Sequence, residues 1–489
     1  MTSGIRTRPR APVGRSGACH TGRVSTSADS IPHASSAAHD VLALLRERLG
    51  AAVDTDAAQL DIARGDKSGH RSDGAPLAIV TPHSVEQVQD LMRIASETRT
   101  SVVVRGAGTG LAGGAIADEG QIVLSTLAMN RLLHVARDDE YAVVEPGILN
   151  GDLNAQLAEY GLWFAPDPAS RAISTVGGNI ATNAGGLLCA KYGVTREAVL
   201  GLKVVLADGR LLELGHRTVK GVTGLDLTAL MIGSEGTLGV VVEATVRTRR
   251  IVPGVAVVIS ATFPTVEDAA RASAVITASG LNPAIMELIG ESAMRHIADL
   301  LELDHDGGAH LIVQFDGPGA TAESDAALTS IRSLGGTAIV SGDREEAERL
   351  FAIRRSFHPS IVRLGGTVLI EDVCVPRSAL PSMFAAIRDI ESRYGIEIPT
   401  VAHAGDGNLH PNFVFPGAEV PDFVWAAADE MFLAALRLGG TLTGEHGIGL
   451  LKRRWLRDEL GDDQLALQRQ VKAVFDPHGI LNPGKVFEA

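Results

Sequence analysis

The chain has 489 residues, too many for one ordinary hydrophobic core, so two or more domains are expected. Hydrophobic residues make up 45% and charged residues 21%, a globular balance, and the lack of any run of about eighteen apolar residues argues against a membrane-spanning helix. The formal net charge of −14 argues against nucleic acid as a main partner, because phosphate binding needs a basic surface.

Residues 1–37 carry five arginines and no acidic residue before Asp29. This composition is typical of a disordered tail and also of a targeting segment, and we favour the disordered tail. The segment has no apolar stretch, so secretion is not expected.

The three cysteines, Cys19, Cys189 and Cys374, are scattered along the chain. They match neither a disulfide framework nor the spacing of a zinc or iron–sulfur motif. We therefore expect a cytoplasmic protein and leave peripheral association with a membrane open.

The first half of the folded chain predicts strands and helices around a glycine-rich loop. A helix is expected near residues 37–50, and a second helix, capped by Ser84 and Gln87, lies between strands at 77–81 and 101–104. This βαβ unit leads into the glycine-rich loop. Further strands are expected at 121–125, at 142–146, on both sides of an Asp208-Gly209 turn, and within 236–248, whereas 166–186 is predicted to be mostly loop.

From about residue 253 a second series of predicted strands and helices begins. A strand at 254–263 precedes a helix that Thr265 and Asp268 cap, and a long helical pattern covers 344–364. The remaining expected elements are strands near 309–315, 337–341 and 367–376, helices at 377–395 and 421–438, and two helices with a turn in 450–489. This alternation predicts an α+β fold.

The glycine-rich loop spans Arg105 to Ala115, and its glycines match the pattern GxGxxG. The next predicted strand follows too closely for the helix that a Rossmann fold requires, so NAD is disfavoured. The loop still offers backbone N–H groups to a pyrophosphate. Two further runs of small residues, 176–186 and 232–241, favour a binding site for a flat ligand rich in hydrogen-bonding groups.

These runs belong to an ordered series of motifs: RGAGTGL, PDPASRAISTVGGNIATNAGG, KYGVTRE, GSEGTLGVV, EDVCVP, HAGDGNLHPNF, TGEHGIG and NPGK. In this series the chain from about residue 40 to 489 resembles the FAD-linked D-2-hydroxy acid dehydrogenases. These are flavoproteins of the vanillyl-alcohol-oxidase / p-cresol-methylhydroxylase type, and they include D-lactate dehydrogenase, the glycolate oxidase D subunit and D-2-hydroxyglutarate dehydrogenase.

The resemblance implies FAD as cofactor, held by three groups of residues: Arg105, Gly106, Ala107, Gly108, Thr109, Gly110 and Leu111 around the pyrophosphate; Asp167, Gly177, Gly178, Asn179, Thr182 and Asn183 along the flavin; and Glu235, Gly239 and Val240 beside the cofactor. No histidine lies between His83 and His134, so the covalent histidine link that some members form in the first glycine loop is absent. The expected divisions are an FAD-binding domain (38–252), an α+β cap domain (253–438) and a C-terminal segment (439–489) that returns to the FAD domain.

The stretch AHAGDGNLH, residues 402–410, predicts a hairpin with Asp406-Gly407 as its two turn residues. That turn would place His403 directly opposite His410, close enough for both imidazoles to bind one divalent ion. Glu445 in TGEHGIG completes a His₂Glu set, the pattern of an open catalytic metal site. The resemblance implies the same three ligands, for Zn²⁺ or alternatively Mn²⁺ or Fe²⁺.

His446 is the candidate general base, since it neighbours a metal ligand and imidazole titrates near neutrality. Its alternative role is to orient Glu445. A metal ion lowers the pKa of the substrate hydroxyl, His446 removes that proton, and the Cα hydrogen leaves as hydride to the flavin. The resemblance implies Arg354 as the cation for the substrate carboxylate and Asn412 as a polar substrate contact, with Arg355 exposed on the helix.

The substrate is expected to be a small 2-hydroxy acid, with D-lactate or glycolate favoured. Ile370 stands where the 2-hydroxyglutarate branch has a lysine and His358 where it has a threonine, while Glu371 would repel a dianion if it pointed inward. D-2-Hydroxyglutarate remains an alternative.

Two alternatives to this enzyme remain open at the sequence level, a flavin-free metallohydrolase and a non-catalytic flavoprotein subunit of an oxidase complex. The sequence does not identify the electron acceptor, which is a quinone, a cytochrome, an electron-transfer flavoprotein or oxygen. Association as a homodimer is also left open.

Overall fold

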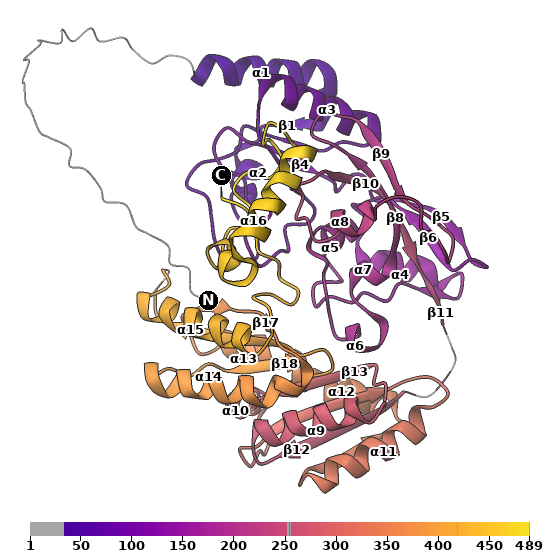
Figure 1. Cartoon of the computed structure of the whole chain (residues 1–489), viewed down its shortest axis with the longest axis vertical. Helices are drawn as coiled ribbons and strands as arrows, with labels where there is room; N and C mark the ends of the chain where they lie inside the picture. Colours follow the sequence, from indigo (N-terminus) through magenta and orange to yellow (C-terminus); the bar gives the residue numbers. More distant parts are fainter. Residues whose placement is uncertain (1–33, 252–253, 255, 418, 489) are drawn as a thin grey trace, which may run out of the picture.

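The computed structural model describes residues 34–251, 254, 256–417 and 419–488. They form two halves stacked along the long axis, with the N-terminal part in indigo and magenta above and the middle of the chain in red and orange below (Figure 1). Of the predicted tail, residues 1–33 lie outside the described residues, and the last four open the first helix, α1 (Ala34–Leu49).

The upper half begins with a four-stranded sheet in the order β1-β2-β4-β3. The helix α3 (Val85–Thr98), capped by Ser84, buries Val88, Leu91 and Ala95 against this sheet. β2 and β3 both run parallel to β4, so the predicted βαβ unit is confirmed. The other bounds are β1 (Val53–Asp54), α2 (Ala57–Ala63), β2 (Ala78–Val80), β3 (Val102–Arg105) and β4 (Ile122–Ser125).

A five-stranded antiparallel sheet, in the order β5-β6-β10-β8-β9, completes the upper half. The predicted hairpin at Asp208-Gly209 is confirmed, with Gly209 at φ +81°, a conformation that favours glycine. The elements are β5 (Leu132–Ala136), β6 (Tyr141–Val144), α4 (Asn150–Ala158), β7 (Leu162–Trp163), α6 (Cys189–Tyr192), α7 (Thr195–Ala198), β8 (Val199–Val205), β9 (Leu211–Gly215), α8 (Leu227–Met231), β10 (Val240–Arg247) and β11 (Arg249–Arg250).

The segment 166–186, predicted to be mostly loop, contains a short helix, α5 (Val176–Thr182). The Thr175 side chain caps it by accepting the N–H of Gly178. Val176 and Ile180 anchor the helix in the core of the upper half. The two glycines at its start obscured the helix in the sequence, because glycine disfavours helices in isolation and tertiary packing overrides that preference here.

The lower half is built on one sheet in the order β15-β12-β14-β13-β18-β19-β16, with β17 paired to β19. Its strands β12, β14 and β15 appear where the sequence predicts them, whereas β13 was not predicted. The bounds are β12 (Val257–Phe263), β13 (Ile285–Ile289), β14 (Ala309–Phe315), β15 (Thr337–Ser341), β16 (Thr367–Ile370), β17 (Val373–Cys374), β18 (Thr400–His403) and β19 (Asn408–Phe415).

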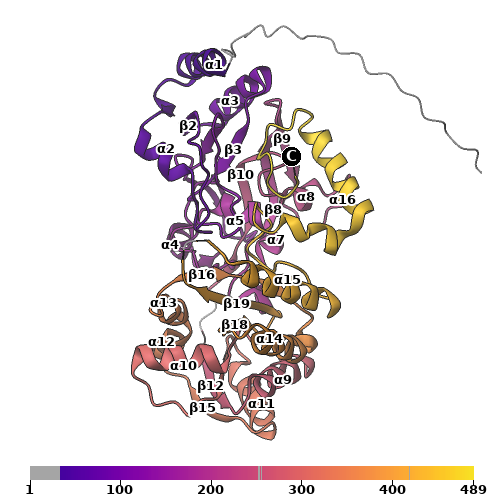
Figure 2. The same ribbon diagram turned by 90° about the vertical axis from the view of Figure 1, so that its left-hand side faces the viewer.

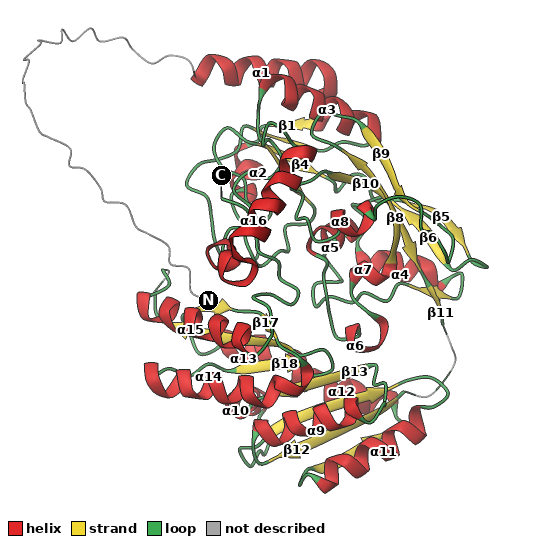
Figure 3. Cartoon of the chain, in the orientation of Figure 1, coloured by secondary structure: helices red, strands yellow, loops and turns green. Residues whose placement is uncertain are grey.

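Helices cover both faces of this sheet (Figure 3). One face packs against α9 (Val266–Ala278), α11 (Ala320–Ser333), α14 (Leu380–Tyr394) and α15 (Asp422–Arg437). The other packs against α10 (Glu291–Leu301), α12 (Arg344–Arg355) and α13 (Phe357–Val362). The predicted helix at 344–364 is therefore two helices, separated at Ser356, and α10 was not predicted. These mixed helices and sheets confirm the α+β class.

The C-terminal segment leaves the lower half and lies beside the first sheet of the upper half, in yellow in Figures 1 and 2. It contains α16 (Leu456–Phe475), in which Gly461 breaks the helical backbone, so the two predicted helices are nearly continuous. The N–H of Val102 in β3 donates to the carbonyl of Ile480, and the N–H of Asn482 donates back to that of Val102. This return joins the end of the chain to β3 of the upper half.

Candidate active site

The histidine hairpin joins β18 to β19, with His403 opposite Asn408 and His410 opposite Val401. The predicted direct pairing of His403 with His410 is therefore wrong. The connection has four residues, 404–407, and the His403 carbonyl accepts N–H groups from both Asp406 and Gly407. Because the register differs by two residues, both imidazoles stay on one face, with ring centroids 5.1 Å apart and ring planes at 84°.

Glu445 completes the cluster from the far end of the chain. Its Oε1 atom lies 3.6 Å from Nε2 of His403 and 3.3 Å from Nε2 of His410. One possible ligand atom from each of the three residues lies within 4.8 Å of the other two. The segment just before Glu445 pairs with the lower half through one bridge, between Thr441 and Cys374.

Asp372, which the sequence analysis did not single out, holds the Glu445 loop in place. Its Oδ2 atom accepts the Thr443 hydroxyl at 2.5 Å and the N–H groups of Glu445 and His446 at 3.0 and 2.9 Å. Its Oδ1 atom lies 3.8 Å from Nδ1 of His410. One fully buried carboxylate therefore fixes the backbone of Glu445 and stands behind His410.

His446 lies beside this cluster with its ring stacked on His410, at 5.2 Å between centroids and 11° between planes. Burial lowers the pKa of His446 to about 4, although Asp372 acts in the opposite direction. The imidazole is thus neutral at neutral pH and able to accept a proton. The expectation that it titrates near neutrality is wrong, because burial penalises the charged form.

Glu287 lies on the other side of the cluster and was also missed. Its side chain is wholly buried on β13, and its two oxygens contact His403 Nδ1 at 2.6 Å and Arg354 Nε at 2.8 Å. Burial alone would lower the pKa of His403, but Glu287 and Glu445 raise it well above its usual value. The predicted arginine is thereby tied to a predicted metal ligand.

The sequence does carry a signal for both missed acids. Each lies within a short apolar strand pattern, IMELI for Glu287 and TVLIEDVCV for Asp372. A carboxylate inside such a pattern is buried and needs partners. The partners themselves lie between 38 and 116 residues away in the chain, so their identity follows only from the fold.

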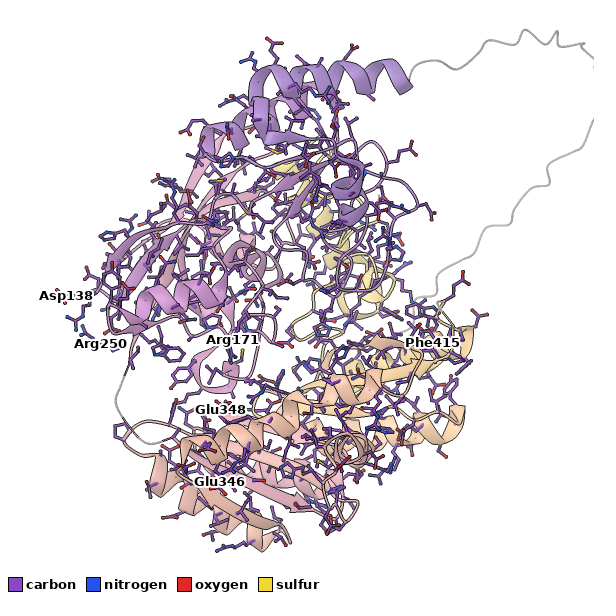
Figure 4. All side chains as sticks on the ribbon, turned by 180° about the vertical axis from the view of Figure 1, so that it is seen from behind. Asp138, Arg171, Arg250, Glu346, Glu348 and Phe415 are labelled. Carbon is purple, nitrogen blue, oxygen red and sulfur yellow. The ribbon has the colours of Figure 1, made fainter. Side chains whose placement is uncertain are left out.

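A cavity of about 560 Å³ opens at the boundary between the two halves, next to this cluster. Glu445 and His446 form part of its wall, as do His358 and Ile370 from the lower half. In Figure 4, Arg171 of the upper half and Glu348 on α12 of the lower half are labelled on opposite sides of this boundary. The reacting groups therefore meet where the halves meet.

Most of the residues predicted to bind the cofactor line the cavity: Gly106, Ala107, Gly108, Thr109, Gly110, Leu111, Gly177, Gly178, Asn179, Thr182, Glu235 and Gly239. The cavity wall thus combines backbone from the three glycine-rich runs. Arg105, Asp167, Asn183 and Val240 do not line it, although Val241 does.

The three polar residues outside the wall support it from behind. Arg105 Nη1 donates to the carbonyls of Gly65 and Ala115, so it joins the end of the glycine-rich loop to the segment around Gly65. Asp167 accepts the N–H of Leu188, and burial raises the pKa of that carboxyl to about 7. Asn183 accepts the N–H of Arg196.

Glu235 connects the cavity wall to the His446 loop. Its oxygens accept the N–H groups of Ile448 and Gly449 at 2.7 and 2.8 Å. Burial raises the pKa of Glu235 to about 7, against the opposing effect of these two N–H groups. The side chain predicted to lie along the cofactor therefore also orders the loop that carries the candidate base.

Only some of the predicted substrate contacts lie in the cavity wall. Asn412 is buried on the same face of β19 as His410 and donates to the carbonyl of His410, but it does not line the cavity. Arg354 is also absent from the cavity wall, whereas Ile370 and His358 line it. Glu371 instead contacts Lys452 Nζ at 3.5 Å and is absent from the cavity wall, so the suggested repulsion of a dianion by Glu371 is not supported.

The residues present fit a flavin and a divalent ion. Asn179 Nδ2 is buried at the cavity wall with no hydrogen-bond partner among the described residues, which suits a ligand rich in acceptors. The ion is matched by two imidazole nitrogens that converge on one carboxylate oxygen, a donor set typical of Zn²⁺ and similar ions.

Two family descriptions match the chain. The FAD binding domain matches residues 76–215, and the C-terminal domain of FAD linked oxidases matches residues 252–486. The chain is 39% identical to the glycolate oxidase subunit GlcD of Bacillus subtilis over 84% of its own length and 89% of the relative. It is 36% identical to D-lactate dehydrogenase of Archaeoglobus fulgidus over 83% and 90%.

Similarity extends to D-2-hydroxyglutarate dehydrogenase of Xanthomonas citri pv. viticola, at 36% identity over 84% of this chain and 89% of the relative. Among solved structures, p-cresol methylhydroxylase superposes with a TM-score of 0.75 at 18% sequence identity, covering 92% of this chain and 97% of that chain. At this identity the likeness shows the fold alone, which is that of the vanillyl-alcohol-oxidase / p-cresol-methylhydroxylase type.

Proposed function

The chain belongs to the FAD-linked D-2-hydroxy acid dehydrogenases and is an FAD-dependent oxidoreductase, and from that premise we propose that it oxidises a small monocarboxylic substrate, D-lactate or glycolate, with the aid of a divalent metal ion. The observation that carries this proposal is the common position of Glu445 and His446 in the wall of the cavity that the three glycine-rich runs line. Metal ligand, base and flavin cavity thus meet in one place.

FAD, when bound, supplies the acceptor for the two electrons removed from the substrate carbon. A divalent ion held by His403, His410 and Glu445 would lower the pKa of the substrate hydroxyl. His446 accepts the hydroxyl proton, since burial keeps its imidazole neutral. The burial of this cluster restricts the access of water to the reacting carbon.

Arg354 is proposed to bind the substrate carboxylate. Its Nε is engaged by Glu287, whereas its two Nη groups have no hydrogen bond or ion pair with the described residues. A guanidinium held in this way presents a planar pair of donors to a carboxylate. Asn412 donates its amide to the backbone carbonyl of His410, so it would contact the substrate only after a rotation of that amide on ligand binding.

The selectivity for a monocarboxylate rests on Ile370. This apolar side chain lies in the cavity wall where the 2-hydroxyglutarate branch has a lysine, so a second substrate carboxylate would lack a cation there. D-2-Hydroxyglutarate is therefore the weaker candidate, although one relative carries that name.

The electron acceptor is proposed to be external: a quinone, a cytochrome, an electron-transfer flavoprotein or oxygen. None of the helices within the described part of the chain is long and apolar enough to cross a bilayer. We infer a cytoplasmic location from the cysteine usage, with peripheral membrane contact or a homodimer as further possibilities to test by fractionation and by light scattering.

The proposal is tested by anaerobic reduction of the bound flavin with D- and L-lactate, glycolate and D-2-hydroxyglutarate. Bleaching with D-lactate or glycolate, and a much slower reaction with L-lactate, is expected. If none of these acids reduces the flavin, the chain is better explained as a non-catalytic subunit. A protein that takes up no flavin at all would favour the metallohydrolase.

A further inference from the structure

The side chain of Glu287 occupies an unusual position for an acid. It lies at the centre of β13, a strand whose five residues are all buried, and its own exposure is zero. A buried carboxylate without partners is strongly destabilising, so such a residue is retained only where its oxygens are satisfied. Both oxygens of Glu287 are satisfied, and by two residues of the proposed reaction.

We propose that Glu287 is a positioning residue that couples the metal ligand His403 to the carboxylate-binding Arg354. The inference deepens the proposed function and rests on it. Glu287 is directly opposite His403 in the β13–β18 pair, so the backbone register of the sheet brings these two side chains together. Arg354 reaches the same carboxylate from α12, which packs on one face of this sheet.

The first consequence concerns His403. An ionised carboxylate only accepts hydrogen bonds, so the contact of Glu287 Oε1 with Nδ1 at 2.6 Å requires the ring proton on Nδ1. In the neutral ring, the form that binds a metal ion, the lone pair is then on Nε2, the atom that faces Glu445 at 3.6 Å. A carboxylate behind a ligand histidine fixes its tautomer and ring orientation and strengthens it as a metal ligand.

The second consequence concerns Arg354. Nε of the guanidinium donates to Glu287 Oε2, and this contact fixes the plane of the side chain. Neither Nη group donates a hydrogen bond to the described residues, so both are proposed to serve the substrate carboxylate. One anchoring carboxylate thus sets the distance between the place for the metal ion and the place for the substrate carboxylate.

The decisive variant is Glu287→Gln, which keeps the shape but has only one acceptor oxygen. If its amide NH₂ faces Nε–H of Arg354, two donors clash; if it faces Nδ1 of His403, the imidazole must move its proton to Nε2 and loses the lone pair for the metal ion. We expect the affinity of the FAD-loaded protein for Zn²⁺, measured by calorimetric titration after chelation, to fall about 10- to 100-fold. We also expect KM for D-lactate to rise at least about tenfold, while kcat at saturating metal falls less.

Two further variants separate positioning from folding. Glu243→Gln removes another strand carboxylate, a half-buried one that pairs with Lys203 in the upper half, and should leave both quantities unchanged. Glu287→Asp keeps the charge and should recover part of the zinc affinity. Flavin content and the thermal midpoint of each variant report its folding.

The outcomes are distinct. A well-folded Glu287→Gln variant whose zinc affinity and KM equal those of the wild type would refute the positioning role. The role would also fall if both values changed only in proportion to a loss of flavin or of folded protein. A wild-type protein that neither binds Zn²⁺ nor is reduced by any 2-hydroxy acid would instead overturn the proposed function, and the positioning role with it.

Discussion

His403 and His410 occupy diagonal rather than opposite positions in the β18–β19 hairpin, yet their rings lie 5.1 Å apart with both Nε2 atoms near the same oxygen of Glu445. The diagonal arrangement turns the rings to 84° instead of stacking them. The two imidazole planes therefore approach a common point from different directions, as a tetrahedral metal site requires.

Removal of a ligand tests this arrangement. His410→Ala takes away one of the three donors, and we expect zinc affinity to fall more than about 100-fold and turnover with D-lactate to follow. Chelation of the wild type should abolish turnover without releasing FAD, and added Zn²⁺ or Mn²⁺ should restore it. Metal analysis measures the bound ion, and flavin absorbance measures the bound FAD. Full activity after complete chelation would contradict the metal site.

Replacement of His446 tests the proton transfer. His446→Ala should slow anaerobic flavin reduction by about 10²- to 10⁴-fold, the usual contribution of a general base. The FAD content should stay the same, because Glu235 and the glycine-rich runs remain in place. Stopped-flow absorbance gives the rate, and an unchanged rate would remove His446 from the role of base.

Gly185 tests the space around Glu445. A Cβ atom at position 185 would lie 2.8 Å from Oε2 of Glu445 and 3.3 Å from its Cβ, so Gly185→Ala must displace that side chain. The displaced atoms are the flexible end of a side chain, and the cost in stability should be below about 1 kcal/mol. Zinc affinity should nevertheless drop about tenfold in titrations of the chelated protein. Gly254→Ala, where the atoms nearest to the added carbon lie 3.7 Å away, serves as the control for an added methyl group.

Ile370 tests substrate selectivity. A lysine at this place in the cavity wall would offer a cation to a second carboxylate, so Ile370→Lys should raise kcat/KM for D-2-hydroxyglutarate relative to D-lactate at least about tenfold. The ratio of the two specificity constants is the measurement. A ratio that does not move would show that the second carboxylate is recognised elsewhere.

His310 provides a test of the lower half away from the site. It is buried on β14 with Nε2 3.1 Å from the Ser260 hydroxyl, and burial lowers the pKa of His310 to about 4, with a smaller effect from His305. As the pH falls below the unfolded value of about 6.5, the unfolded chain binds the proton first, so this contribution to stability is lost between about pH 6.5 and 4.

The His310→Gln variant should lack this loss. Between about pH 7 and about pH 4.5, the wild type should therefore lose about 2 to 3 kcal/mol more free energy of unfolding than the variant. Urea unfolding at the two pH values measures it. Parallel pH profiles for the two proteins would show that His310 is not held neutral.

Much of the fold follows from local patterns in the chain. The capped helix after Ser84, the hairpin at Asp208-Gly209 and the helix after Thr265 all appear as predicted, because caps and turns are decided by residues within one turn of each other. The α5 helix and the unpredicted pair β13 and α10 depend instead on packing against distant elements. The helix and strand propensities of the residues do not predict that packing.

The order of the motifs in the chain was enough to predict the family, the flavin and a group of histidines and acids. How these side chains meet depends on the fold. The longer turn of the hairpin is held from outside, because the N–H of Val375, just after β17, donates to the carbonyl of Gly407. Likewise Glu287 reaches His403 across 116 residues through sheet register. Residue types fix which bonds are possible, while the pairing of strands distant in sequence fixes which ones form.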